Sequence, residues 1–261
     1  MGNADKIERM RSNLRLGRLI RIWIGLGCFL AALSHGHAFK LSPITKEFTP
    51  DGRGSSQAFQ LENDSDQTVA VQVSMLTREM QLDGSEINLP ADDDFAVFPS
   101  QILLRAGQVQ TVRVQWAGTD NPPQELSYRI LAEQLPVNFT REPAVGAKIN
   151  VVIRYLGSVY IVPPGAKSDV AIESVVPTEG QNNEALLEVT FHNRGTAHTI
   201  LRDLKLTLKV DATTVELDSK ALSGIAGENL LAGAKRRFVL PRPAELPEGP
   251  VEVDFHFNRR R

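Results

Sequence analysis

Apolar and polar side chains alternate with a period of two along most of the chain after residue 38. Residues 67–76 (QTVAVQVSML) place Val69, Val71, Val73 and Met75 on one face and polar or small side chains on the other. Four further segments repeat this period: 110–116, 184–191, 204–210 and 251–257. Because successive side chains of a strand point to opposite faces, the pattern predicts strands with one buried face. We find no amphipathic helix longer than two turns, so we expect an all-β protein.

A proline-rich segment divides the strand-rich region into two parts. Residues 161–166 (IVPPGA) contain paired prolines, which lack backbone donors, followed by a glycine that permits a turn. The parts on either side, residues 39–162 and 163–261, both approach the roughly 100 residues of an immunoglobulin-like sandwich. Many short strands separated by Gly, Pro, Asn and Asp also favour a sandwich. We therefore predict two immunoglobulin-like β-sandwich domains, and we find no internal sequence repeat.

The first 38 residues have the pattern of a secretory signal peptide. A basic segment ends at Arg21, and the apolar run 22–33 (IWIGLGCFLAAL) follows it. Gly36 and Ala38 supply small residues before a predicted cleavage site at Phe39. An uncleaved membrane anchor is the alternative, although the run is shorter than the roughly 20 residues needed to span a bilayer. We expect a cleaved signal peptide and an exported protein.

The charge and the cysteine content of the chain argue against nucleic-acid binding and against stabilisation by disulfides. Residues 1–38 hold six basic and two acidic side chains, so the remaining 223 residues carry 23 basic and 29 acidic ones. An acidic exported region lacks the basic stripe that nucleic-acid binding requires. Cys28, the only cysteine of the chain, lies in the predicted signal peptide. The exported region would therefore be stabilised by its cores and not by disulfides.

Motifs typical of enzymes and metal sites are absent from the sequence. The chain has no HExxH, nucleophile elbow, P-loop or dinucleotide fingerprint. His192 and His198 flank a predicted turn and could form a metal pair, but the pattern favours two ordinary surface histidines. The acidic run 92–94 is interpreted as a solvated loop, because calcium loops space their oxygen ligands more widely. We expect a non-enzymatic protein without cofactor or metal.

Four groups of segments resemble one protein family in their order and spacing. Residues 95–114 (FAVFPSQILLRAGQVQTVRV) combine an aromatic-Pro pair, a turn at Ala-Gly-Gln and an alternating strand. Residues 126–136 (LSYRILAEQLP) and 148–163 (KINVVIRYLGSVYIVP) follow, and residues 39–52, followed by 58–63 (AFQLEN), resemble the opening strands. Behind a signal peptide, this series resembles the PapD-like periplasmic chaperones of the chaperone–usher pathway.

The resemblance implies a fold, partners and a mechanism. The fold is two immunoglobulin-like sandwiches, and the first binds pilus or fimbrial subunits. Such a chaperone lends an edge strand to the incomplete sandwich of a subunit and delivers the subunit to an outer-membrane usher. It acts in the periplasm and uses neither nucleic acid nor a small-molecule substrate. The alternative that we keep is a secreted β-sandwich adhesin or a structural subunit of the pilus.

The resemblance also predicts the residues of the binding site. The donor strand corresponds to residues 148–154, where Ile149, Val151 and Ile153 share one face. Periodicity alone favours the alternative that these three side chains fill the protein's own core, and it is the position of the strand, which matches the family's donor strand just before the linker, that favours the donor role.

The family also anchors the terminal carboxylate of the subunit with two basic residues. At the matching positions this chain carries Thr45 and Ser158 instead. Arg129, Arg154 and Lys46 are therefore the predicted substitutes, with an ordinary surface role as the alternative for each.

Overall fold

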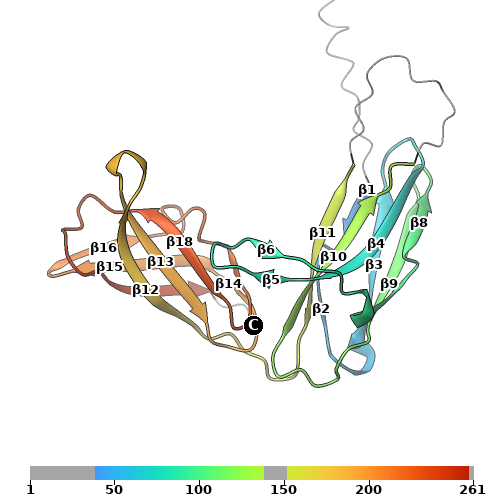
Figure 1. The fold of residues 1–261 in the computed structure, drawn as a ribbon, viewed down its shortest axis with the longest axis horizontal. Coiled ribbons are helices and arrows are strands. Elements are labelled where there is room, and N and C mark those ends of the chain that lie inside the picture. Colours follow the sequence, from blue (N-terminus) through green and yellow to red (C-terminus); the bar gives the residue numbers. More distant parts are fainter. Residues whose placement is uncertain (1–38, 138–151, 259–261) are drawn as a thin grey trace, which may run out of the picture. The chain divides into compact units, whose positions relative to one another are not determined.

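The computed structural model describes residues 39–137 and 152–258, which form an all-β protein (Figure 1). The predicted signal peptide lies outside these residues. Within them, three single turns of 3₁₀ helix are the helical elements: Gly52–Ser55, Asp92–Asp94 and Gln181–Asn183. No helix in this described part is long and apolar enough to cross a membrane. The predicted all-β class is confirmed.

Two sheets and a short hairpin make up the first half of the described chain. The four-stranded sheet has the order β1 (Phe39–Ser42), β3 (Ser56–Asn63), β9 (Val109–Trp116) and β7 (Phe95–Phe98). The five-stranded sheet has the order β2 (Thr45–Phe48), β11 (Arg154–Ile161), β10 (Leu126–Gln134), β4 (Val69–Thr77) and β8 (Gln101–Leu104). The hairpin pairs β5 (Glu79–Met80) with β6 (Glu86–Ile87).

The predicted alternation explains how the first core forms. The apolar side chains of β4 at positions 69, 71, 73 and 75 are buried, as are those of β9 at 112, 114 and 116. They come from different sheets and belong to one cluster of buried side chains. Aromatic rings of Phe95, Trp116 and Tyr128 meet edge-on or tilted, with centroids 4.9–5.6 Å apart. Burial of these apolar faces is the main term that stabilises the sandwich.

The second half is a second sandwich with its own core. One sheet contains β12 (Val170–Glu179), β13 (Ala185–Asn193) and β18 (Lys235–Pro241). Another contains β16 (Thr213–Leu217), β15 (Arg202–Val210) and β19 (Glu252–Asn258), and β14 (Thr199–Ile200) pairs with β17 (Asn229–Leu230). The segments predicted at 184–191, 204–210 and 251–257 correspond to β13, β15 and β19, so these predictions are confirmed.

A buried asparagine closes the same corner in both sandwiches. Asn63 ends β3 and donates from Nδ2 to the carbonyl oxygens of residues 67, 104 and 105 at 2.7–3.1 Å. Asn193 ends β13 and donates in the same way to residues 197, 230 and 231 at 2.8–3.2 Å. Both side chains are fully buried. Each side-chain amide therefore uses its donor capacity inside the protein, on backbone carbonyls that its buried position puts within reach.

Glycine at position 157 allows the first strands to approach β11 closely. A Cβ added to Gly157 would lie 2.7 Å from Ile130 Cγ2 and 3.0 Å from the carbonyl oxygen of Ile44. The backbone N–H of Ser158 donates to that same carbonyl at 2.8 Å. Parallel pairing of β2 with β11 begins at this point, with Ser158 opposite Thr45. The glycine therefore fixes where β2 joins the five-stranded sheet.

Candidate functional site

Two arginines converge on one glutamate beside β10 and β11. Glu86 Oε1 accepts hydrogen bonds from Arg78 Nε at 2.8 Å and from Arg129 Nη2 at 2.7 Å, and Arg78 Nη2 lies 2.8 Å from the same oxygen as an ion pair. Glu86 Oε2 accepts from Arg129 Nε at 2.9 Å, so that Arg129 grips the carboxylate with two nitrogens. We call Arg78, Glu86 and Arg129 the Arg–Glu–Arg cluster. Paired donors on a planar guanidinium match a carboxylate in geometry as well as in charge.

Strand register brings the three side chains together. Arg129 lies in β10 opposite Ser158 of β11, and its Nη1 donates to Ser158 Oγ at 2.7 Å. Arg78 lies between β4 and β5, and its backbone N–H donates to the carbonyl oxygen of Ser127 at 3.2 Å. Glu86 reaches both arginines from β6 of the hairpin.

A tyrosine accepts from a third nitrogen of Arg78, one that does not contact Glu86. Arg78 Nη1 donates to Tyr160 Oη at 2.8 Å, and Asn229 Nδ2 donates to the same oxygen at 2.7 Å. Tyr160 lies on β11 and Asn229 on β17. Because each guanidinium has several fixed partners, the cluster is preorganised and does not depend on two flexible surface side chains meeting.

The cluster is largely removed from solvent. The exposed fractions of the side chains are 5% for Arg78, 17% for Arg129 and 17% for Glu86. Burial alone would raise the pKa of Glu86, but hydrogen bonds and charges from Arg129 and Arg78 outweigh it and hold this pKa below its ordinary value. Glu86 is therefore ionised at neutral pH, and the cluster carries one net positive charge. An excess guanidinium in a sheltered position is suited to bind a carboxylate.

The positions aligned with the family's basic pair lie next to this cluster. Ser158 faces Thr45 on one side and Arg129 on the other. Of the predicted anchors, Arg129 is therefore the one whose guanidinium reaches Ser158. Arg78, which the sequence analysis did not single out, also approaches Ser158 Oγ, at 3.5 Å.

The other two predicted anchors lie elsewhere. Arg154 Nε pairs with Glu133 Oε1 at 3.1 Å, and its side chain is 58% exposed. Arg154 is four residues before Ser158 on β11, which corresponds to about 13 Å along a strand. Lys46 Nζ donates to Gln57 Oε1 at 3.2 Å, toward β3 of the other sheet. Neither side chain joins the Arg–Glu–Arg cluster in the described structure.

The edge of β11 is open at its beginning. β11 pairs with β10 along its full length, but β2 covers its other edge only from Ser158 to Ile161. Within the described residues, no strand pairs with residues 154–157 on that side. Leu156 is 48% exposed there, and Val152 just before the strand is 44% exposed. Unpaired backbone groups beside exposed apolar side chains are what a strand-addition site requires.

The structure describes only one of the three predicted donor residues. Ile149 and Val151 lie outside the described residues. Ile153 is partly buried and packs against the first core, and its carbonyl oxygen accepts from the backbone N–H of Gln134 at 2.9 Å. The donor role of Ile149, Val151 and Ile153 stays a prediction.

Of the two histidines that could have formed a metal pair, His198 makes other contacts. His198 Nδ1 lies 2.8 Å from both carboxylate oxygens of Glu125, and its ring stacks on Tyr160 with centroids 3.8 Å apart. His192 lies in β13. In the part of the chain that the structure describes, no group of three or more His, Cys, Asp or Glu side chains could hold a metal ion. In the predicted solvated loop 92–94, Asp94 accepts a hydrogen bond from Tyr128 Oη at 3.0 Å.

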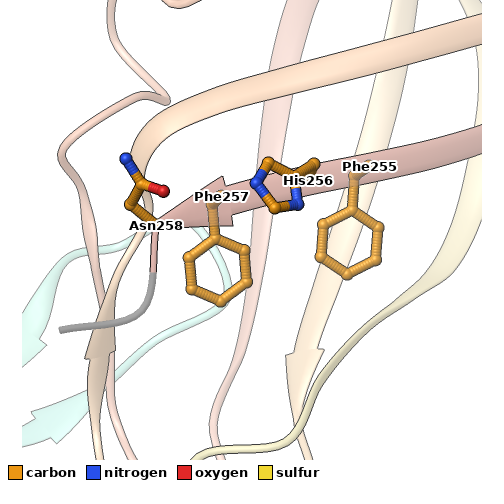
Figure 2. A pocket seen from close by; sticks show the side chains of 4 residues that line it. All are labelled: Phe255, His256, Phe257 and Asn258. Atoms are coloured by element: carbon orange, nitrogen blue, oxygen red, sulfur yellow. The ribbon is translucent and has the colours of Figure 1, made fainter. Parts of the chain in front are cut away.

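A hollow of about 400 Å³ lies beside β19, and none of the residues discussed above lines it (Figure 2). Its lining consists of four consecutive residues: Phe255, His256, Phe257 and Asn258. The rings of Phe255 and Phe257 lie nearly parallel, with centroids 6.1 Å apart. Because the lining offers no converging charges, this hollow has less chemical specificity than the Arg–Glu–Arg cluster.

Comparison with known families identifies the first half of the chain. Residues 48–167 match the family model described as the pili and flagellar-assembly chaperone, PapD N-terminal domain. The first half is a PapD-type domain. This match runs from the last residue of β2 to the residues after β11, and so includes the Arg–Glu–Arg cluster and the open edge. The resemblance to PapD-like chaperones inferred from the sequence is confirmed.

Solved structures extend the likeness from the PapD-type domain to both sandwiches. A chain in the CsuC–CsuE chaperone–tip subunit pre-assembly complex from Acinetobacter baumannii matches with a TM-score of 0.56 and 15% identity, covering 84% of this chain and 97% of that one. The class 5 fimbriae chaperone CfaA matches with a TM-score of 0.50 and 13% identity, covering 85% and 100%. A chain in the Salmonella enterica SafA pilin–SafB chaperone complex matches with a TM-score of 0.50 and 18% identity, covering 78% and 85%. No curated protein sequence matches. At these identities the structural matches show a shared fold, which is that of two-domain PapD-like chaperones.

Proposed function

We propose that this chain is a periplasmic chaperone that stabilises pilus or fimbrial subunits by donor-strand complementation and delivers them to an outer-membrane usher. The observation that carries the proposal is the match of residues 48–167 to the family of pili-assembly chaperones. The matched structures are named as complexes of chaperones with a tip subunit or a pilin, which favours subunits of this class as partners here. The signal pattern of residues 1–38 supports export to the periplasm.

Strand addition at β11 is the proposed means of binding. An incomplete subunit sandwich exposes an apolar groove and unpaired strand edges, which are templates for aggregation. The open edge at residues 154–157 can supply backbone hydrogen bonds, and the predicted donor residues Ile149, Val151 and Ile153 can supply apolar side chains. Each side chain buried in a partner contributes at most about 1.5–3 kcal/mol, from which association and ordering costs are subtracted.

The proposed anchor for the terminal carboxylate of the subunit is the arginine pair of the Arg–Glu–Arg cluster. Arg129 lies beside Ser158 and Thr45, where relatives of this family carry their basic pair, and Arg78 adds a second guanidinium. A carboxylate bound at this point would align the subunit strand along β11, because charge-assisted hydrogen bonds from a planar guanidinium fix both position and direction. Arg154 and Lys46 are not part of this proposal.

The test is co-expression of the chain with pilus subunits encoded near it in the same organism. The measured quantity is the soluble subunit that co-purifies with the chain. The wild type is compared with Val151→Asp, which places a charge on the predicted donor face, and with Val109→Asp as a matched control. Val109 is 52% exposed on β9 of the other sheet, so its substitution leaves β11 intact.

The expected result is a one-to-one complex for the wild type and for Val109→Asp, and its loss for Val151→Asp. Circular dichroism and the fluorescence of buried Trp116 establish that each variant is folded. Failure of the wild type to rescue any subunit would contradict the chaperone function. Equal complex formation by a folded Val151→Asp would contradict the donor strand alone.

A further inference from the structure

The Arg–Glu–Arg cluster already contains the chemical group that its arginines are suited to bind. Glu86 presents a carboxylate to Arg78 and Arg129 through three hydrogen bonds of 2.7–2.9 Å and a further ion-pair contact with Arg78 Nη2 at 2.8 Å. The carboxylate comes from the hairpin and not from β10 or β11, which form the framework of the site. An incoming carboxylate would meet two arginines whose best donors are in use.

From this arrangement we infer that Glu86 is an internal substitute ligand that the terminal carboxylate of a bound subunit replaces. The inference rests on the proposed function and adds an affinity-determining residue to it. Glu86 keeps the arginines paired while no subunit is bound, since two unpaired buried guanidiniums would be costly. Every subunit must then compete with Glu86, so this residue lowers the affinity of the site for any carboxylate.

The hairpin allows such an exchange. β5 and β6 share only two residue pairs, Glu79 with Ile87 and Met80 with Glu86. Rotation of the Glu86 side chain would release the arginines without breaking the backbone bond between Leu82 and Arg237 at the hairpin tip or the bond from Asn88 Nδ2 to Thr77. Arg129 and Arg78 would stay in place, because Ser158 and Tyr160 hold their other nitrogens.

The first test is a competition for a limiting pilus subunit between differently tagged wild type and Glu86→Gln. Glutamine retains the size of the side chain and removes the competing charge. We expect Glu86→Gln to capture about fivefold more subunit, because the apparent affinity rises with the fraction of sites that are free to bind. Glu133→Gln is the matched control, since it removes the charge of the exposed pair with Arg154, and we expect it to capture the wild-type amount.

The subunit then carries a short Gly-Ser extension at its C-terminus, which moves the carboxylate out of register. The advantage of Glu86→Gln should disappear with this extended subunit. Equal capture of the native subunit by Glu86→Gln and wild type would overturn the inference. An advantage that persists with the extended subunit would overturn it as well.

The second test needs no subunit and therefore separates this inference from the proposed function. The melting temperature of Glu86→Ala is measured at neutral pH in sodium acetate and in sodium chloride of equal ionic strength. Acetate should fill the vacated site and raise the melting temperature by about 2 °C, with no such rise for the wild type or for Glu133→Ala. If acetate has no specific effect on folded Glu86→Ala, the arginines are not a carboxylate receptor and the inference fails. If acetate acts but the wild type binds no subunit, the proposed function fails instead.

Discussion

Arg129 and Arg154 form a natural pair for testing whether the Arg–Glu–Arg cluster stabilises the protein. Both are arginines on neighbouring strands of one sheet, and both contact a glutamate. They differ in environment, because the Arg129 side chain is 17% exposed and the Arg154 side chain is 58% exposed. The perturbation is truncation of each one to alanine.

The structure gives different magnitudes for the two truncations. Arg129→Ala removes three hydrogen bonds of 2.7–2.9 Å, two to Glu86 and one to Ser158. Removal of one partner from a buried ion pair costs about 3–5 kcal/mol when the other charge is left alone. Arg78 still pairs with Glu86, so we expect Arg129→Ala to lower the free energy of unfolding by about 2–3 kcal/mol. Arg154→Ala should lower it by about 0–1 kcal/mol, as for an exposed pair.

Urea unfolding followed by the fluorescence of Trp116 measures both effects. Trp116 is buried in the first core, and it is the only tryptophan of the predicted exported chain. A double-mutant cycle with Glu86→Ala should give a coupling energy of at least about 1 kcal/mol between Arg129 and Glu86. If Arg129→Ala and Arg154→Ala lowered the free energy of unfolding equally and the coupling energy were near zero, the cluster would not stabilise the protein as a buried ion pair does.

Three further predictions concern the groups that hold the two sandwiches and the cluster. Gly157→Ala should lower the free energy of unfolding by about 1–3 kcal/mol, because its Cβ would overlap Ile130 Cγ2 and crowd the carbonyl oxygen of Ile44; an unchanged urea midpoint would contradict these close contacts around Gly157. Asn63→Asp and Asn193→Asp should each lower the free energy of unfolding by about 3 kcal/mol or more, since a carboxylate cannot donate to the three carbonyls around it. The melting temperature measured by calorimetry should fall accordingly. A wild-type melting temperature for either variant would show that its corner is not closed in this way. Because the pKa of Glu86 is lower in the folded protein than in the unfolded chain, where it is near 4.5, ionised Glu86 stabilises the fold at a pH above 4.5. This stabilisation is lost as the pH falls through the pKa of the folded state. From pH 7 to pH 3.5, the urea midpoint should therefore decrease less for Glu86→Gln than for the wild type. Equal decreases in the two proteins would contradict the lowered pKa of Glu86.

The fold could be predicted because its strands alternate clearly. In β4 and β9 the apolar set is buried on one face, as the period of two requires. The short strands β5, β6, β14 and β17 have only two residues each, too few to show a period. The hydrogen bonds of the buried Asn63 and Asn193 side chains could not be predicted either, because they join residues up to 42 positions apart in the chain.

The site could be predicted only in part. Arg129 could be predicted because the family resemblance points to the segments that form β10 and β11. In the structure, the strand register places Arg129 opposite Ser158. Arg78 and Glu86 were missed because they lie at the hairpin, where the sequence has neither alternation nor a motif. Arg154 and Ser158 lie on the same face of β11, because they are an even number of positions apart, but four residues of extended strand keep Arg154 away from the cluster. Side-chain convergence of this kind depends on tertiary register, which periodicity alone does not encode.

The open edge of β11 has a consequence for the solubility of the protein when no partner is present. Backbone groups that are free to receive a foreign strand are equally free to pair with a second copy of the same edge. In an antiparallel self-pairing centred on Arg154, two guanidiniums would face each other, each with only its own Glu133 as a partner among the described residues, and like charges directly opposite are destabilising. An arginine that adds little to folding stability would in this way discourage the chain from aggregating with itself, while a subunit strand with an apolar or acidic residue at that point would meet no such repulsion.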